Sequence, residues 1–271
     1  METSGAAVLA GAGDSGGSIG GPRHGSGGRA GVGPGAGIQV DRQEYMSLVG
    51  SLLYAAMVTR PAIAFAVQKL SRKLQEPEPA DWVAGKRVLR YLAGTPGLGL
   101  ICGEAGGRRE SEELMGFSDS DWGGDRVTRQ STTAFVFMVS GGAVSWESKL
   151  QATVAKSSCE AEYMALCSAV SEAVYLRRLL SELGHGGSGP VVIYVDNQGA
   201  IQLAHNPAHH RLTKHIDIQY HFIRERVGSG EVKLEWVPTG RQLADLLTKA
   251  VSAGRVQELR GAIMGGAGTS Q

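Results

Sequence analysis

Hydrophobic residues recur at three- and four-residue spacing between residues 41 and 98, the pattern of helices that bury one face. A first helix is predicted around Tyr45, Leu48, Val49, Leu52 and Leu53. Pro61 stands where a second helix would begin, because proline suits the first turn of a helix. The segment QEPEPAD interrupts the pattern, and a third predicted helix ends at Gly94. These residues therefore predict a small helical segment.

From about residue 112 the pattern changes to short β-type runs that later alternate with helices. The predicted strands lie at 114–121, 132–139, 143–146, 191–195 and 231–237. The predicted helices lie at 157–183, 198–205 and 213–227, with a last helix that opens at Thr239. Ser140-Gly141-Gly142 is typical of a hairpin turn between two strands. This order predicts an α/β fold, in which helices pack on the faces of a mixed sheet.

The first 38 residues are mainly Gly, Ala and Ser, with almost no large apolar side chains. Such a segment cannot bury enough surface to offset the entropy of ordering, so we predict that it is disordered. The chain then divides into four predicted parts. These are a Gly-rich leader at 1–38, a helical segment at 39–98, an α/β domain at 112–252, and a C-terminal helix and tail at 253–271.

Composition narrows the classes of function. The net charge is only +1, so binding of a nucleic acid would need a local basic patch. The three cysteines form no CxxC pair, which argues against a disulfide framework or a cysteine zinc site. No apolar run approaches the roughly 18 to 20 residues that span a bilayer, and the N-terminus lacks the pattern of a secretory signal. We expect a soluble protein, cytoplasmic or nuclear rather than secreted, with no membrane partner.

Acidic residues lie on or directly after two of the predicted strands. Asp196 follows the most apolar strand, and ligand sites gather at the carboxyl ends of parallel strands. The alternative is that Asp196-Asn197 caps the next helix. Asp119 and Asp121 are two residues apart on a strand and share a face, so both or either can reach such a site. Asp125, four residues after Asp121, can also lie near such a site.

The long predicted helix offers two glutamates, which its geometry separates. Glu162 is the first residue of a stripe whose members are three or four residues apart, and this stripe should face the sheet. Its other members are Leu166, Ala169, Ala173, Leu176 and Leu180. Glu160 lies about 200° round the helix from Glu162 and points elsewhere. A carboxylate on a buried stripe needs a partner, because burying it alone is costly. Glu162 is therefore the predicted site residue.

Asp245 is predicted to lie early in the last helix. Thr239 followed by Gln242 is typical of a capping box at the start of that helix. On this evidence alone, the preferred interpretation of Asp245 is a favourable charge in the first turns of a helix.

Several strings resemble the RNase H domain of copia-type retrotransposon Pol polyproteins. They occur in the order of that family and are FSDSDWGGD, RQSTTAFVFMVSGGAVSWESKLQATVAKSSCEAEYMAL, YVDNQGAIQLAHNP, TKHIDIQYHFIRE and QLADLLTK. The helical string YMSLVGSLLYAAMVTRPAIAFAVQKLSR resembles the segment that connects reverse transcriptase to RNase H in those polyproteins. The resemblance covers about residues 41 to 250.

This resemblance implies an RNase H-like fold with a five-stranded mixed sheet and an active site of four carboxylates. By motif these are Asp119, Glu162, Asp196 and Asp245. It implies two Mg²⁺ or Mn²⁺ ions, which suit carboxylate oxygens, as cofactors. The implied substrate is the RNA strand of an RNA–DNA hybrid, cleaved to a 5′-phosphate and a 3′-hydroxyl, and the implied partner is a reverse-transcriptase module.

Contacts with the hybrid would need local positive charge. The candidate nucleic-acid-binding residues near the motifs are Arg126, Arg129, Lys149, Lys156, Lys214 and Arg241. Any one of them can instead be a solvated surface charge. The alternative function is a catalytically inactive remnant of a retrotransposon polyprotein, either nucleic-acid-binding or structural.

Overall fold

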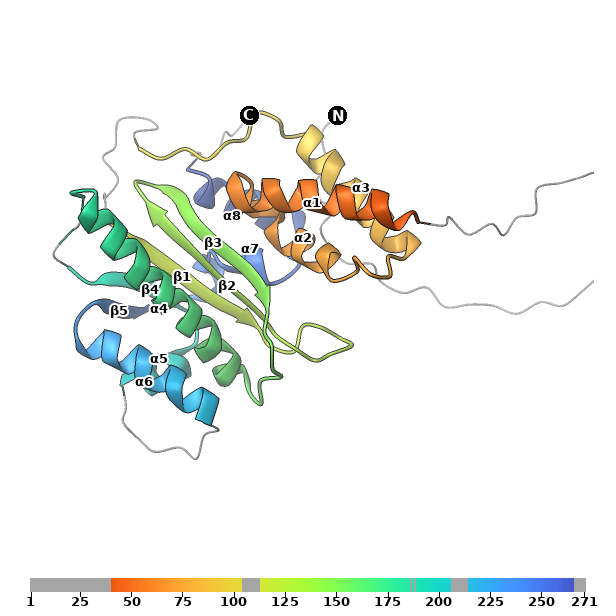
Figure 1. Cartoon of the computed structure of the whole chain (residues 1–271). Helices are drawn as coiled ribbons and strands as arrows, with labels where there is room; N and C mark the ends of the chain where they lie inside the picture. Colours follow the sequence, from red (N-terminus) through yellow and green to blue (C-terminus); the bar gives the residue numbers. More distant parts are fainter. Residues whose placement is uncertain (1–39, 104–112, 186, 188, 206–213, 266–271) are drawn as a thin grey trace, which may run out of the picture.

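The computed structural model describes residues 40–103, 113–185, 187, 189–205 and 214–265 (Figure 1). The predicted disorder of residues 1–38 lies outside these ranges, as do the last six residues of the predicted C-terminal tail. None of the helices in the described ranges combines the length and apolarity that a bilayer crossing requires.

A five-stranded mixed sheet forms the centre of the molecule, with strand order β3-β2-β1-β4-β5. The strands are β1 (Met115–Asp121), β2 (Thr132–Val139), β3 (Gly142–Leu150), β4 (Val191–Val195) and β5 (Val232–Trp236). The first three pair antiparallel, whereas β4 pairs parallel with both β1 and β5. The predicted RNase H-like fold, with three antiparallel strands and two more alongside, is therefore confirmed.

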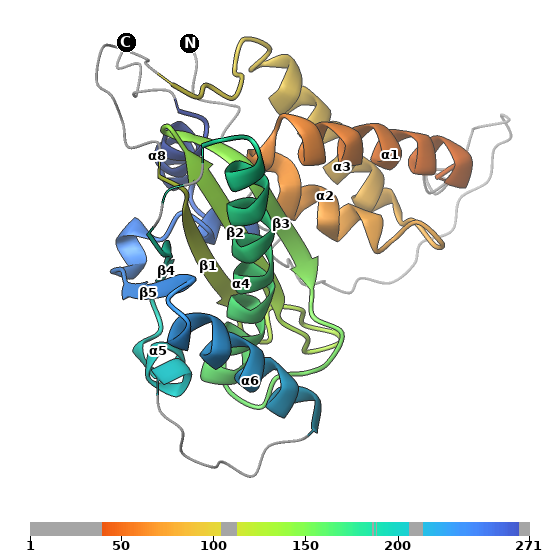
Figure 2. The ribbon, with the colours of Figure 1, turned by 60° about the vertical axis from the view of Figure 1, so that its left-hand side comes forward.

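One face of the sheet is covered by α4 (Ser158–Glu182), α5 (Gln198–His205) and α6 (Lys214–Gly228) (Figure 2). The stripe predicted on α4 faces this core, where Leu166, Ala169 and Ala173 are fully buried. They pack with Phe137 of β2 and Ile193 of β4. Burial of this stripe fixes the rotation of α4, and with it the direction of every side chain on that helix.

The opposite face of the sheet is covered by helices from both ends of the chain (Figures 1 and 2). They are α1 (Arg42–Val58), the 3₁₀ turn η2 (Pro61–Ile63), α2 (Ala64–Ser71), α7 (Asp245–Thr248) and α8 (Ala253–Ile263), and α3 (Pro79–Ala93) packs on α1 and α2. Tyr45 of α1, Val136 of β2 and Leu259 of α8 belong to one buried cluster. The helical segment thus shares its core with the sheet and with α8. The predicted domain boundaries remain a proposal.

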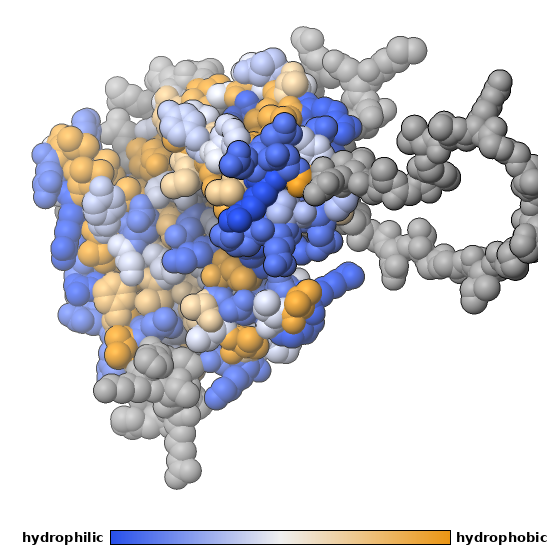
Figure 3. All heavy atoms as spheres, turned by 45° about the vertical axis from the view of Figure 1, so that its right-hand side comes forward, coloured by the Kyte–Doolittle hydropathy of each residue, from blue (hydrophilic) through white to orange (hydrophobic). Residues whose placement is uncertain are grey.

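Some apolar side chains of the helical segment are exposed rather than buried. Tyr54 and Met57 of α1 are mostly exposed. A face of the molecule seen in Figure 3 shows hydrophobic surface interspersed with hydrophilic surface.

Short-range sequence signals account for several turns and helix ends. The hairpin between β2 and β3 has Ser140 and Gly141 at φ values of 48° and 77°, the left-handed conformation of tight hairpin turns. Ser157 caps α4, because its side chain accepts a hydrogen bond from the Glu160 N–H at 3.1 Å. The strand predicted at 143–146 is longer than expected and runs to Leu150.

The predicted capping box at Thr239 is wrong. Residues Thr239–Arg241 form only a 3₁₀ turn, η3, the chain is extended at Gln242, and α7 begins at Asp245. Both side chains of the predicted box bond to distant parts of the sheet instead. The Thr239 hydroxyl donates to Asp196 at 2.9 Å, and the Gln242 amide donates to the Ser118 carbonyl at 2.9 Å. Long-range hydrogen bonds therefore replace the local ones.

Candidate active site

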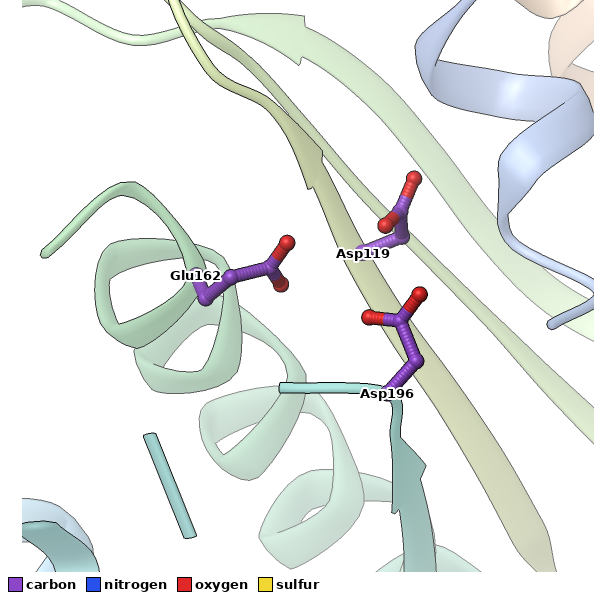
Figure 4. Close-up of side chains that lie close together, drawn as sticks. All are labelled: Asp119, Glu162 and Asp196. Atoms are coloured by element: carbon purple, nitrogen blue, oxygen red, sulfur yellow. The ribbon is translucent and has the colours of Figure 1, made fainter. Parts of the chain in front are cut away.

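Three of the four predicted carboxylates meet at one end of the sheet (Figure 4). Asp119 lies on β1, Glu162 in the first turns of α4, and Asp196 directly after β4. One oxygen from each lies within 4.8 Å of the other two. Figure 4 shows the Glu162 carboxylate reaching from α4 toward the two aspartates. Because β1 and β4 run parallel as neighbours, their carboxyl ends bring the two aspartates together.

Helix geometry separates the two glutamates as predicted. Glu162 is only 6% exposed. Glu160 points away from the cluster, and its carboxylate accepts a hydrogen bond from the Lys156 N–H at 2.7 Å. Glu160 therefore supports the start of α4, whereas Glu162 is directed into the site.

The capping role considered for Asp196 belongs to its neighbour. The Asn197 side chain accepts a hydrogen bond from the Ala200 N–H at 3.1 Å and so caps α5. Asp196 is anchored from the other side, where its carboxylate accepts from the Thr239 hydroxyl. Its carbonyl accepts from the indole N–H of Trp236 at 3.2 Å. These two bonds hold Asp196 at the end of β4.

The other acids near β1 have different surroundings. Asp121 is half-buried and is not among the three clustered carboxylates. Asp125 caps the loop after β1 by accepting from the N–H groups of Val127 and Thr128, and it pairs with Arg72 at 2.6 Å. The local pattern could not rank Asp119 and Asp121. The structure selects Asp119, because it directly follows Ser118, which pairs with Val195, the residue before Asp196.

Asp245 is buried but is not within the 4.8 Å group. Its carboxylate pairs with the ammonium of Lys249 at 2.6 Å, and the same ammonium lies 3.8 Å from the Asp119 carboxylate. The Thr248 hydroxyl donates to Asp119 as well. The contacts of Lys249 and Thr248 with the acids of the site were not predicted from the sequence. The spacing of Asp245 and Lys249, four residues apart, is a signal for the ion pair, but no local signal marks Thr248.

Burial dominates the electrostatics of the cluster. It raises the pKa of Asp119 to about 7, with Asp245 and Asp196 adding to the rise and Lys249 opposing it. Burial, followed by repulsion from Asp119 and Asp196, also raises the pKa of Glu162 well above its ordinary value. Desolvation is therefore the main cause of both raised pKa values, and repulsion between the acids is secondary to it. Without a cation, ionisation of Asp119 and Glu162 is therefore disfavoured.

The sequence relatives of the chain include retrotransposon Pol polyproteins. The chain is 45% identical over 207 residues to the retrovirus-related Pol polyprotein from transposon TNT 1-94 of Nicotiana tabacum, over 76% of this chain and 15% of that polyprotein. It is 44% identical over 212 residues to that from transposon RE2 of Arabidopsis thaliana, over 78% of this chain and 14% of that polyprotein. The chain belongs to the copia-type Pol family. No family model matches the sequence.

This Pol segment therefore spans only about 15% of the length of the polyproteins that it matches. Among solved structures, it is similar to LC11-RNase H1 in complex with an RNA/DNA hybrid, with a TM-score of 0.36 and 13% sequence identity. That match covers 50% of this chain and 94% of the LC11-RNase H1 chain.

The three clustered side chains of the Pol segment fit a divalent metal ion. All three offer carboxylate oxygens, the ligands that Mg²⁺ and Mn²⁺ prefer. One oxygen of Glu162, Oε2, is buried without a hydrogen-bond partner within the described residues. A buried carboxylate oxygen without a donor is costly, and a bound cation would supply what it lacks. The cluster is therefore a candidate metal site.

Five of the six predicted nucleic-acid-binding residues of the Pol segment have exposed side chains: Arg126, Arg129, Lys149, Lys156 and Arg241. Arg241 lies in η3, next to the segment that anchors Asp196. The side chain of Lys214 lies outside the described part of the structure. Their contact with a nucleic acid remains a prediction.

Proposed function

We propose that this Pol segment is a metal-dependent endoribonuclease that cleaves the RNA strand of RNA–DNA hybrids. The observation that carries the proposal is the group of Asp119, Glu162 and Asp196, whose oxygens lie within 4.8 Å of one another. The group lies at the carboxyl ends of two parallel strands, in a member of a retrotransposon Pol family. A buried acidic cluster of this kind is unfavourable unless it binds a cation.

Each carboxylate has a distinct part in the proposed site. Asp119 and Asp196 would be the central metal ligands. Glu162 and Asp245 would be the outer ligands, one on each side of the site. Thr248 and Thr239 fix the aspartates, because their hydroxyls donate to Asp119 and Asp196 and restrict both side chains to one orientation. Two Mg²⁺ or Mn²⁺ ions would supply an activated water and stabilise the leaving 3′ oxygen. The products would be a 5′-phosphate and a 3′-hydroxyl.

The proposed substrate would be recognised by its shape. Groove width and 2′-hydroxyl groups distinguish a strand of RNA without reading its sequence. The exposed cations Arg126, Arg129 and Arg241 would contact phosphates on either side of the cluster. The helical segment, which shares a core with the sheet, would connect the domain to a reverse-transcriptase module.

A cleavage assay on a hybrid with labelled RNA tests the proposal. The full chain should cleave the RNA strand in Mg²⁺ or Mn²⁺ and not in EDTA. Asp196→Asn should abolish cleavage, with a loss of at least about a hundredfold, as is usual when an electrostatic group of an active site is removed. Glu162→Gln should do the same. Its matched control, Glu160→Gln, changes a carboxylate two residues away that points elsewhere and should retain activity.

The outcomes separate the alternatives. Cleavage that survives Asp196→Asn would refute the assignment of the site. Hybrid binding without cleavage would indicate a nucleic-acid-binding remnant, and the absence of both would indicate a structural one.

A further inference from the structure

Lys249 places a positive charge between two buried acids of the site. Its ammonium lies 2.6 Å from Asp245 Oδ1 and 3.8 Å from Asp119 Oδ2. The lysine side chain is 36% exposed, whereas those of Asp119 and Asp245 are 2% and 7% exposed. Lys249 directly follows α7, the short helix that begins with Asp245. One cation therefore bridges a strand at the centre of the sheet and a helix from the end of the chain.

This ion pair differs from the pairs on the surface of the protein. Surface pairs contribute little, because water solvates both partners. Asp119 and Asp245 are shielded from water, so each depends on the charges and donors beside it. Burial disfavours the charged form of Asp119, and the ammonium of Lys249 opposes that effect. Lys249 therefore stabilises two acids that would otherwise repel each other.

The same contact accounts for the position of Asp245. The other three acids lie together, whereas Asp245 is outside the group and bound to Lys249. A divalent cation that used both Asp119 and Asp245 would meet the ammonium at short range, and the two positive charges would repel each other. The ammonium is at the partly exposed end of a flexible side chain, so it can turn toward solvent while both acids stay in place.

We propose that Lys249 is an internal counter-ion of the metal-free site, which a divalent cation displaces to gain Asp245 as a further ligand. The inference rests on the proposed metal site and adds that Lys249 and the metal ion compete for Asp245. Lys249 acts here as a positioning residue. It holds Asp119 and Asp245 together before the metal binds, and it weakens the binding of the metal because its own contact must be broken.

Metal affinity measured without nucleic acid tests this competition. Lys249→Met keeps the length of the side chain and removes its charge. Mn²⁺ binding is measured by electron paramagnetic resonance. The full-length variant should bind Mn²⁺ at least about tenfold more tightly than the wild type, because the charged contact between Lys249 and Asp245 no longer has to be broken. Lys249→Arg keeps a cation at this position and should bind Mn²⁺ no more tightly than the wild type.

Lys69 provides the matched control. Its ammonium lies over the ring of Phe65 and affects Asp121 through space, and the described residues show no ion pair between Lys69 and Asp119 or Asp245. Lys69→Met removes one nearby positive charge without removing the bridge, so its Mn²⁺ affinity should stay within about twofold of the wild type. Thermal unfolding gives a second measurement. Mn²⁺ should raise the midpoint of Lys249→Met more than that of the wild type.

Three results would overturn the proposal: an unchanged or weaker Mn²⁺ affinity in Lys249→Met, an equal gain in Lys249→Arg, or an equal gain in Lys69→Met. Failure of the metal site itself has a different signature, since Mn²⁺ binding would then be absent in the wild type or unaffected by Asp119→Asn. If the wild type binds Mn²⁺ through Asp119 and Lys249→Met does not bind more tightly, only the competition is refuted.

Discussion

Replacing Asp119 with asparagine should stabilise the metal-free protein at pH 8, although the residue is proposed to be essential for activity. The Asp119 carboxylate is 2% exposed, and its pKa rises from 3.8 to about 7, chiefly because of burial. An acid with a raised pKa in the folded state makes that state less stable once it ionises. The destabilising effect of Asp119 is thus absent below about pH 4 and grows as the pH rises to 7.

The magnitude follows from the change in pKa. The difference between 3.8 and about 7 is about three pH units, and each unit corresponds to about 1.4 kcal/mol. Ionising Asp119 in the folded protein therefore costs about 4 kcal/mol. Asparagine resembles the protonated acid and avoids this cost, but it does not reproduce every contact. We expect Asp119→Asn to raise the free energy of unfolding at pH 8 by about 2 to 4 kcal/mol.

Urea unfolding followed by far-ultraviolet circular dichroism measures this difference. Wild type and variant are compared in EDTA at pH 4 and pH 8, where the slopes of the two unfolding curves should agree. The gain should be present at pH 8 and nearly absent at pH 4. Adding Mg²⁺ should stabilise the wild type alone, because only a folded state with an intact site binds the ion. Asp41→Asn is the control, since asparagine caps α1 as well as aspartate does.

A variant that is less stable than the wild type at pH 8 would refute this reasoning. So would an equal gain at both pH values, because an effect of packing or hydrogen bonding does not depend on ionisation of the carboxylate. A wild type whose stability does not fall between pH 4 and pH 7 would contradict the raised pKa directly.

Two further predictions concern Asp125, in the loop after β1, and Gln242, before α7. Asp125→Asn should lower the free energy of unfolding at pH 7 by about 1 to 2 kcal/mol, because hydrogen bonding to the Thr128 N–H lowers the pKa of Asp125 to about 2, with further contributions from Val127 and Arg72. This contribution is present above about pH 4 and is lost as the pH falls toward 2, so unfolding curves at pH 7 and pH 2 should show a difference only at pH 7. Gln242→Leu should cost about 1 to 3 kcal/mol in urea unfolding, because it leaves the buried Ser118 carbonyl without its donor. It should also weaken Mn²⁺ binding, since Gln242 links the chain before Asp245 to β1, and an unchanged affinity would show that Asp245 is positioned independently of that link.

Local periodicity was enough to predict most of the fold and two of the acids. The stripe on α4 distinguished Glu162 from Glu160, because a helix with one buried face fixes where each of its side chains points. The apolar run before Asp196 placed it at the end of a strand, because a parallel strand that is covered on both faces is an almost continuous apolar run. Each signal lies in the helix that carries the acid or in the strand directly before it, so the sequence contains it.

The tertiary structure alone decided the remainder of the site. Asp119 and Asp121 share one face of β1, and the neighbouring end of β4 makes Asp119 the member of the cluster. Thr239 and Gln242 match a local capping box but bond to Asp196 and to the carbonyl of Ser118. The pairing of Asp245 with Lys249 is local, but its extension to Asp119 joins residues that are far apart in the chain. Such contacts depend on which strands become neighbours, and that is settled by burial of the whole core rather than by any single stretch of sequence.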